Sequence, residues 1–158
     1  MKKIITIHQN ENLIWLGLID KISKADEFVI LDTVDFEKNY FQNRNKIRTK
    51  DGWSWVTIPV EKHNHKPIKD IKVSFDNNWK KKYLGTIEQN YKKSPYFEQY
   101  FPYIQYIINK NYSYLIDYNR DLLYHFCYSE QYHAPHISHQ SQTVDCTPKE
   151  ILYTLVFA

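Results

Sequence analysis

The stretch IITIHQNENLIWLGLIDKISKADEFVILDT, residues 4–33, decides the fold that we predict for this chain. Apolar and β-branched residues over 3–8 predict a short strand buried on both faces, and the run over 27–33 predicts a second strand. Leucines and isoleucines recur at helical spacing between them, so we expect a helix capped by Asn10 or Asn12. This order is the βαβ pattern, which implies two parallel strands.

The sequence beyond this unit predicts a hairpin and then helices. Two β-rich runs, 43–49 and 53–60, flank a turn that contains Asp-Gly, which is typical of a hairpin. Alternation over 68–74 predicts a further strand near a sheet edge. Helical periodicity follows over 76–94, 100–109 and 113–128. We therefore predict an α/β fold: a mixed β-sheet with an N-terminal βαβ unit, a β-hairpin and a helical C-terminal half.

Composition restricts the class of protein. The 158 residues fit one domain, and the net charge of +3 comes from interspersed charges, which argues against a nucleic-acid partner. Two cysteines are too few for a disulfide framework, and three glycines leave no glycine-rich phosphate loop. The first apolar run stops at His8, too early for a signal peptide, and no stretch is long enough for a membrane span. These features predict a cytoplasmic location.

Composition changes near residue 130. Residues 131–158 contain no asparagine and a single lysine, Lys149, whereas both types are frequent before them. We therefore expect one domain over 1–130, complete or not, and a divergent tail over 131–158. A surface tail that has drifted in composition is one explanation, and a change of reading frame near Glu130 is another.

Polar side chains follow both predicted parallel strands at the points where they end. His8 and Gln9 end the first strand, and Asp32 ends the second. Open α/β folds bind their ligands at the carboxyl ends of such strands. We expect His8 to be a general base and Asp32 to orient its imidazole. The alternative is a histidine at a strand end that bonds only to backbone.

A cluster of candidate binding residues begins the predicted hairpin. Asn43, Arg44 and Asn45 are consecutive, and Lys62 follows the second strand. Guanidinium groups bind phosphate or carboxylate in a fork, and side-chain amides bind sugar hydroxyls or carbonyls. The alternative is a solvated strand with a surface lysine.

Histidine spacing gives little support for a metal. His63 and His65 are two residues apart, as ligands on an extended strand can be, but no third ligand accompanies them. Three tail histidines are three residues apart: His133, His136 and His139. Pro135 interrupts any helix that would align them. We predict neither a metal site nor a cofactor.

Four segments, in this order, resemble the WbqC-like family of bacterial proteins. They are HQNENLIWLGLIDKISKADEFVILD (8–32), NRNKIRTKDGWSWVTIPV (43–60), KPIKDI (66–71) and NWKKKYLGTIEQNYKKSPYFEQYFP (78–102). The resemblance runs from about Ile4 to Tyr128. It implies a cytoplasmic protein encoded with enzymes that build lipopolysaccharide O-antigen or other surface polysaccharide.

The family pattern matches this chain at all seven candidate site residues and at three further positions. Matching positions are His8, Gln9, Trp15, Asp32, Asn43, Arg44, Asn45, Thr57, Pro59 and Lys62. Asn10 and Ile14 replace two prolines of the family, which loosens the turn after the first strand. The family's usual continuation after Tyr128 is absent, so a truncated member is one reading.

The resemblance and the residues together predict a transferase that moves an acyl or aminoacyl group onto a nucleotide-linked amino sugar. Arg44 and Lys62 would bind phosphate, and Asn43 and Asn45 would orient the sugar or stabilise the oxyanion. The expected partners are the nucleotide sugar and an acyl donor. The alternative is a noncatalytic protein that binds a sugar nucleotide or a partner enzyme.

Overall fold

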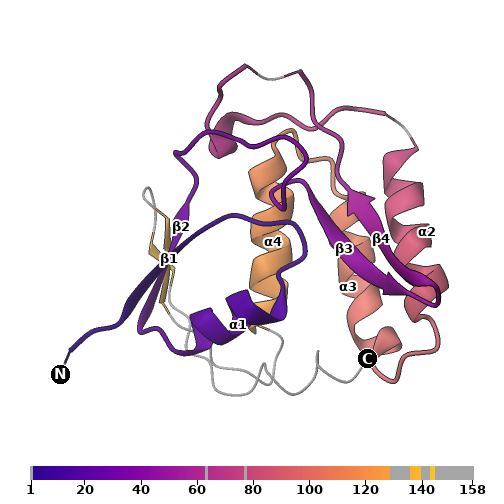
Figure 1. Ribbon diagram of the computed structural model, residues 1–158, viewed down its shortest axis with the longest axis horizontal. Coiled ribbons are helices and arrows are strands. Elements are labelled where there is room, and N and C mark those ends of the chain that lie inside the picture. Colours follow the sequence, from indigo (N-terminus) through magenta and orange to yellow (C-terminus); the bar gives the residue numbers. More distant parts are fainter. Residues whose placement is uncertain (1, 63, 77, 129–135, 140–142, 145–158) are drawn as a thin grey trace.

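A computed structural model describes residues 2–62, 64–76, 78–128, 136–139 and 143–144, and Figure 1 shows the arrangement of its elements. The strands are β1 (Ile5–Gln9), β2 (Glu27–Leu31), β3 (Arg44–Thr49), β4 (Gly52–Thr57), β5 (His136–His139) and β6 (Thr143–Val144). The helices are α1 (Leu16–Ser23), the 3-10 helix η1 (Ile68–Asp70), α2 (Trp79–Tyr91), α3 (Phe97–Asn109) and α4 (Leu115–Tyr128).

Two sheets form from these strands. The four-stranded sheet has the order β1-β2-β5-β6, in which β1 and β5 both pair parallel to β2, and β6 pairs antiparallel to β5. Strands β3 and β4 form a separate antiparallel hairpin. The parallel pair joined through α1 confirms the predicted βαβ order, and the mixed sheet, hairpin and C-terminal helices confirm the α/β class.

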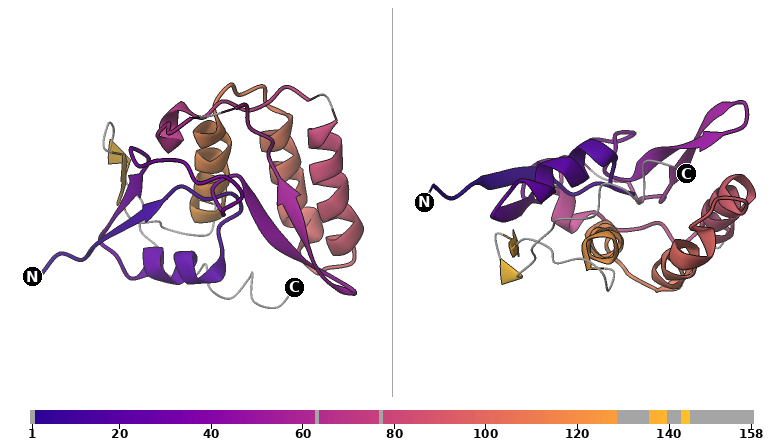
Figure 2. Two further views of the ribbon diagram at one scale, coloured as in Figure 1. Left: turned by 45° about the horizontal axis from the view of Figure 1, so that its top comes forward. Right: turned by 90° about the horizontal axis from the view of Figure 1, so that it is seen from below.

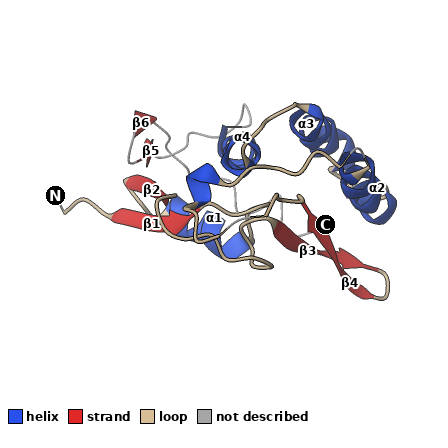
Figure 3. Cartoon of the chain, turned by 90° about the horizontal axis from the view of Figure 1, so that it is seen from above, coloured by secondary structure: helices blue, strands red, loops and turns tan. Residues whose placement is uncertain are grey.

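The elements lie in two layers. Figure 3 shows α2, α3 and α4 in a row on one side, and the strands β1 to β4 on the other. Figure 2 shows that the hairpin extends along α2 and α3, while β1, β2 and α1 lie on the far side of α4. Helix α4 therefore lies between the parallel strands and the hairpin region.

Two clusters of buried side chains form the core, and α4 contributes to both. Leu122 and Phe126 pack with residues of the hairpin, α2 and α3. Leu123 and Cys127 pack with α1 and with Phe28 and other residues of β2. Successive positions on α4 supply the two clusters because they lie on different faces of a helix. Cys127 is 1% exposed, so its thiol lies within this core.

Strand β1 is not buried on both faces, contrary to the sequence prediction. Ile5 is 54% exposed and Ile7 is 53% exposed, whereas Phe28 and Ile30 of β2 are buried. The strand order places β1 at an edge of the sheet, and the cluster around α1 contains Phe28 and Ile30 of β2 but no residue of β1. An edge strand covered on one face buries alternate residues, so an apolar run does not by itself show burial on both faces.

Two further predictions, the start of the first helix and the strand over 68–74, also differ from the structure. Helix α1 begins at Leu16, so neither Asn10 nor Asn12 caps it. Residues 68–74 form η1 and isolated bridges in place of a strand. Ile68 and Ile71 are both buried, and their spacing of three suits a 3-10 turn better than a strand.

Helix α3 begins at Phe97 and contains Pro102, whereas the sequence predicted a helix that begins at residue 100. Tyr83 and Ile87 of α2 and Leu122 of α4 are buried, which agrees with the helical periodicity expected over 76–94 and 113–128. Most of the tail predicted over 131–158, including His133, lies outside the described residues. His63 lies outside them as well. Among the residues described, no helix combines the length and the hydrophobicity that crossing a membrane requires.

Candidate functional site

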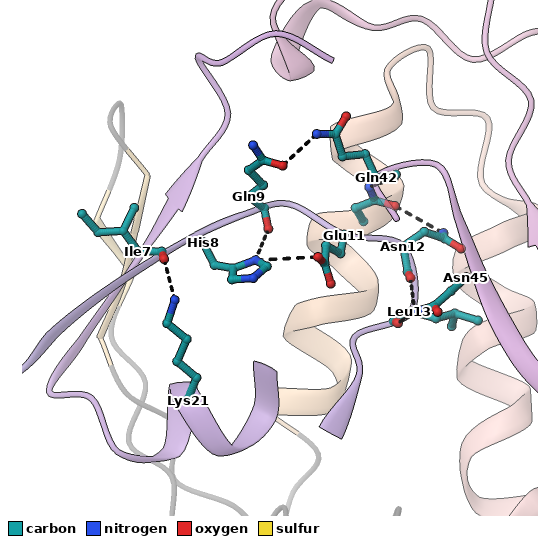
Figure 4. A network of polar contacts seen from close by, with 10 residues as sticks. Ile7, His8, Gln9, Glu11, Asn12, Leu13, Lys21, Gln42 and Asn45 are labelled. Carbon is teal, nitrogen blue, oxygen red and sulfur yellow. Dashed lines mark hydrogen bonds and ion pairs between the residues drawn. The ribbon is translucent and has the colours of Figure 1, made fainter. Parts of the chain in front are cut away.

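His8 lies near the carboxyl end of β1, and its imidazole meets two oxygen atoms of the following turn. Its Nδ1 is 3.0 Å from the carbonyl oxygen of Gln9 and 3.9 Å from Oε1 of Glu11 (Figure 4). A carbonyl oxygen only accepts hydrogen bonds, so Nδ1 carries the proton in this arrangement. The Nε2 atom of the neutral ring then holds a lone pair, as a general base requires.

Glu11 is a buried carboxylate beside this imidazole. Its side chain is 9% exposed, and its Oε2 atom has no hydrogen-bond partner among the described residues. Burial raises the pKa of the Glu11 carboxyl above its ordinary value, while His8 and a hydrogen bond from Trp15 act in the opposite direction. Of these two neighbours, His8 does more to stabilise the charged form of the Glu11 carboxyl, through its positive charge.

Asn12 anchors the turn in a buried hydrogen-bond network. Its Nδ2 donates to Oδ1 of Asn119 at 3.3 Å, and its Oδ1 accepts from the Tyr83 hydroxyl at 3.0 Å. Asn45 Nδ2 donates to the Asn12 carbonyl at 2.9 Å. Buried amides with satisfied bonds fix a loop strongly, because breaking any bond leaves an unpaired group away from water.

Gln9 is held by a second connection. Gln42 Nε2 donates to Gln9 Oε1 at 2.9 Å, and Gln42 Oε1 accepts the Glu37 backbone N–H at 2.8 Å. Asn119 Nδ2 donates to the Gln42 carbonyl at 2.7 Å, which joins this connection to the network around Asn12. Figure 4 shows the resulting set of polar side chains beside the end of β1. The site is therefore built on a rigid polar framework.

The strand register places Asp32 relative to His8. His8 lies opposite Ile30, and Asp32 follows two residues later, on the same face of the sheet. Asp32 is buried. The carboxylate that contacts the imidazole at 3.9 Å is that of Glu11. An orienting role for Asp32 stays a prediction.

The other predicted residues divide between two faces of the hairpin. Asn45 points inward to the network around Asn12, and buried Asn43 donates to the Ile58 carbonyl at 3.1 Å. Arg44 points outward, with its guanidinium carbon 4.0 Å from the centre of the Trp55 ring. Its terminal nitrogen also donates to the Asn39 carbonyl. Neighbouring strand residues face opposite sides, so Arg44 and Asn45 do not converge.

Lys62 lies beyond β4 and is exposed. Oδ1 of Asn43 is buried without a hydrogen-bond partner among the described residues. Of the predicted set, His8, Gln9 and Asn45 thus join one polar framework, and Lys62 is exposed. Arg44 is half-buried on the other face of the hairpin, and its Nε atom is buried without a hydrogen-bond partner among the described residues.

Sequence reasoning missed Glu11, Gln42 and Asn119. Glu11 carried a signal, because it follows His8 by three residues within a turn. Gln42 and Asn119 carried none, since they lie 33 and 107 residues from their partners Gln9 and Asn12. Within the described residues, no group of three or more His, Cys, Asp or Glu side chains could hold a metal ion.

The fold and this site define an α/β protein with a histidine and a buried carboxylate after its first parallel strand. The model of the WbqC-like protein family matches residues 9–146, and the chain belongs to this family.

The chain is also similar to the uncharacterized protein Rv1507c of Mycobacterium tuberculosis, with 32% identity over 101 residues. This match covers 63% of the chain and 43% of the relative, so the chain spans less than half the length of the curated relative it matches. No solved structure matches the chain.

Proposed function

We propose that this protein is a transferase that moves an acyl or aminoacyl group from a thioester donor to the amine of a nucleotide-linked amino sugar, in surface polysaccharide synthesis. The observation that carries the proposal is the contact of His8 with buried Glu11 at the end of β1, with Nδ1 as the protonated nitrogen. Membership of the WbqC-like family supports the proposal only through the link to surface polysaccharide that the resemblance implies.

The proposed step uses His8 Nε2 as the general base. It accepts a proton from the sugar amine as the amine nitrogen attacks the thioester carbonyl carbon, and the imidazole becomes positively charged. The tetrahedral intermediate then collapses, the carbon–sulfur bond breaks, and the leaving sulfur takes the proton from Nε2. An amide and a free thiol result, so protons and charge balance.

Glu11 would stabilise the imidazolium between these two events. Its carboxylate lies 3.9 Å from Nδ1 and is largely shielded from water, which strengthens attraction between opposite charges. Asp32, on the same sheet face, is a second candidate for this role. We assign phosphate binding to Arg44 and Lys62 and sugar or oxyanion binding to Asn43 and Gln9, whereas Asn45, whose amide donates to the Asn12 carbonyl, holds the turn in place.

The test is an assay of product formation. The purified chain is incubated with nucleotide-linked amino sugars and thioester donors, and both the free thiol and the amide product are measured. We expect the two products in equal amounts with at least one donor and acceptor pair. Saturable binding of a nucleotide sugar with no product from any donor would contradict the transferase and favour the alternative, a noncatalytic binding protein.

A further inference from the structure

A cavity of about 550 Å³ lies between the hairpin and the helices α2, α3 and α4. Its walls include Ile87 of α2, Phe97, Phe101 and Ile104 of α3, and Phe126 of α4. Residues 13–16, which connect the polar turn to α1, close another side. Volumes of this size are typical of sites that enclose small molecules.

The walls offer almost no charge to a ligand. Of the described residues that line the cavity, Lys46 alone carries a charged side chain. Its ammonium nitrogen lies 4.1 Å from the centre of the Trp53 ring on the outer face of the hairpin. The charge of Lys46 therefore lies on the face of the hairpin opposite to Asn45 and Ile47, its two neighbours that also line the cavity.

Two polar side chains of the walls, those of Asn45 and Tyr91, are already bonded within the protein. The Asn45 amide donates to the carbonyls of Asn12 and Leu13, and the Tyr91 hydroxyl accepts the Arg48 backbone N–H. A charged ammonium, as an aminoacyl group carries, would lose its water here and meet no carboxylate among the described residues of the walls. A hydrocarbon chain loses no hydrogen bonds on entering.

One end of the cavity adjoins the candidate site. Trp15 lines the cavity and donates a side-chain hydrogen bond to Glu11, the carboxylate beside His8. Asn45 lines it as well and holds the Asn12 carbonyl. Residues 11–15 therefore run from the polar pair directly into the cavity wall.

We propose that this cavity binds the hydrocarbon chain of an acyl donor, with the thioester group at the end near Trp15. The inference rests on the proposed function and narrows it, because it selects an apolar acyl group over an aminoacyl group. The cavity is continuous with the turn that carries Glu11. For this reason we assign the cavity to the chain of an acyl donor rather than to an apolar peptide.

Isothermal titration calorimetry of the full chain with coenzyme A thioesters of two, six and ten carbons tests the inference without any acceptor. We expect the dissociation constant to fall by roughly fourfold for each added methylene that is buried. Free coenzyme A and the two-carbon thioester should bind equally weakly. Equal affinity for all chain lengths would overturn the proposal and leave the apolar walls to a protein partner.

Two variants locate the binding. Leu16→Asp places a charge in the cavity wall at the start of α1, where an acidic residue favours the helix. Ile104→Phe fills space from α3. Each variant should lower the ratio of the affinity for the ten-carbon thioester to that for the two-carbon thioester by at least tenfold. Phe75→Asp, at a side chain that is 69% exposed and outside the cavity, is the control and should keep the preference.

The two proposals fail in different ways. Binding that depends on chain length without amide formation retains the cavity assignment and rejects the transferase. Amide formation with an aminoacyl donor, without dependence on chain length, retains the transferase and rejects the cavity assignment. Preference for a long chain that survives both Leu16→Asp and Ile104→Phe also contradicts the assignment.

Discussion

At the residue scale, Glu11 combines two properties that rarely occur together without a function. It is a buried carboxylate with one oxygen that lacks a hydrogen-bond partner in the described part of the chain, and it lies beside a histidine. Such an arrangement disfavours the folded state when the carboxylate is charged. The same arrangement favours a positive charge on His8, which the proposed proton transfer creates.

Glu11→Gln tests whether the buried charge of Glu11 lowers the stability of the fold while it supports the proton transfer to His8. Because burial raises the folded-state pKa of Glu11 above its unfolded value, its contribution to stability is present below that unfolded value and is lost as pH rises through the folded pKa. We expect Glu11→Gln to raise the midpoint of thermal unfolding at pH 8 and to have a smaller effect at pH 4. The variant should also lower the rate of amide formation. A lower unfolding midpoint at pH 8 would show that Glu11 is a structural residue.

Tyr83→Phe tests the rigidity of the turn. The substitution removes the 3.0 Å hydrogen bond to Asn12 and leaves the Asn12 Oδ1 atom buried without that partner. We expect a loss of about 1–3 kcal/mol in the free energy of unfolding, measured by denaturant titration. Tyr106→Phe, at a side chain that is 65% exposed, is the matched control and should change it by less than about 0.5 kcal/mol. Equal effects of the two variants would contradict the network.

At the element scale, α1 positions the link between the site and the cavity. The Trp15 ring folds back over Gly17, so that a Cβ built at Gly17 would lie 2.0 Å from the nearest ring atom. A glycine in the first turn therefore admits the ring, and the ring bonds to Glu11. The sequence predicted the helix from its periodicity, but the need for a glycine under Trp15 depends on the fold.

Gly17→Ala should displace Trp15. We expect a changed tryptophan fluorescence spectrum, a lower rate of amide formation and a folded chain, because alanine favours helix. Gly85→Ala in α2 is the control, since no atom lies within 4 Å of the added Cβ. It should raise the free energy of unfolding by roughly 0.5–1 kcal/mol and leave the rate unchanged. An unaltered rate in Gly17→Ala would remove Trp15 from the account.

Helix α4 carries a half-buried titratable group, His125. Its imidazole stacks on Tyr103 at 4.4 Å between ring centres, and its Nε2 has no hydrogen-bond partner among the described residues. Burial lowers the pKa of His125 below its ordinary value, so its contribution to stability is present above the unfolded pKa and is lost as pH falls. We expect His125→Phe to reduce the fall in unfolding midpoint between pH 7.5 and pH 5. An unchanged pH dependence would contradict this assignment.

At the scale of the whole molecule, local patterns predicted the elements, and distant contacts build the site. The order of β1, α1 and β2, the hairpin and the apolar faces of α2 and α4 followed from spacing alone. The caps at Asn10 and Asn12 were wrong because these amides bond across the fold. Asn12 and Asn119 are 107 residues apart, and no local pattern indicates such a pair.

The same limit applies to the candidate site residues. His8 was identified because strand ends converge in α/β folds, a rule that depends on topology and not on side chains. Alternation along β3 predicts that Arg44 and Asn45 face opposite sides, and their contacts agree. The position of Glu11, three residues after His8, was visible in the sequence, but its burial required the geometry of the turn, since an acidic residue in a polar segment normally lies in solvent.

The central claim is that His8 accepts the proton during transfer, and the rate constant for amide formation in His8→Asn tests it most directly. His65→Asn is the matched control, because the His65 side chain is 94% exposed. With saturating donor and acceptor, we expect His8→Asn to lower kcat by roughly 100-fold or more, while His65→Asn leaves kcat unchanged. A kcat for His8→Asn equal to that of the unsubstituted chain would contradict the account.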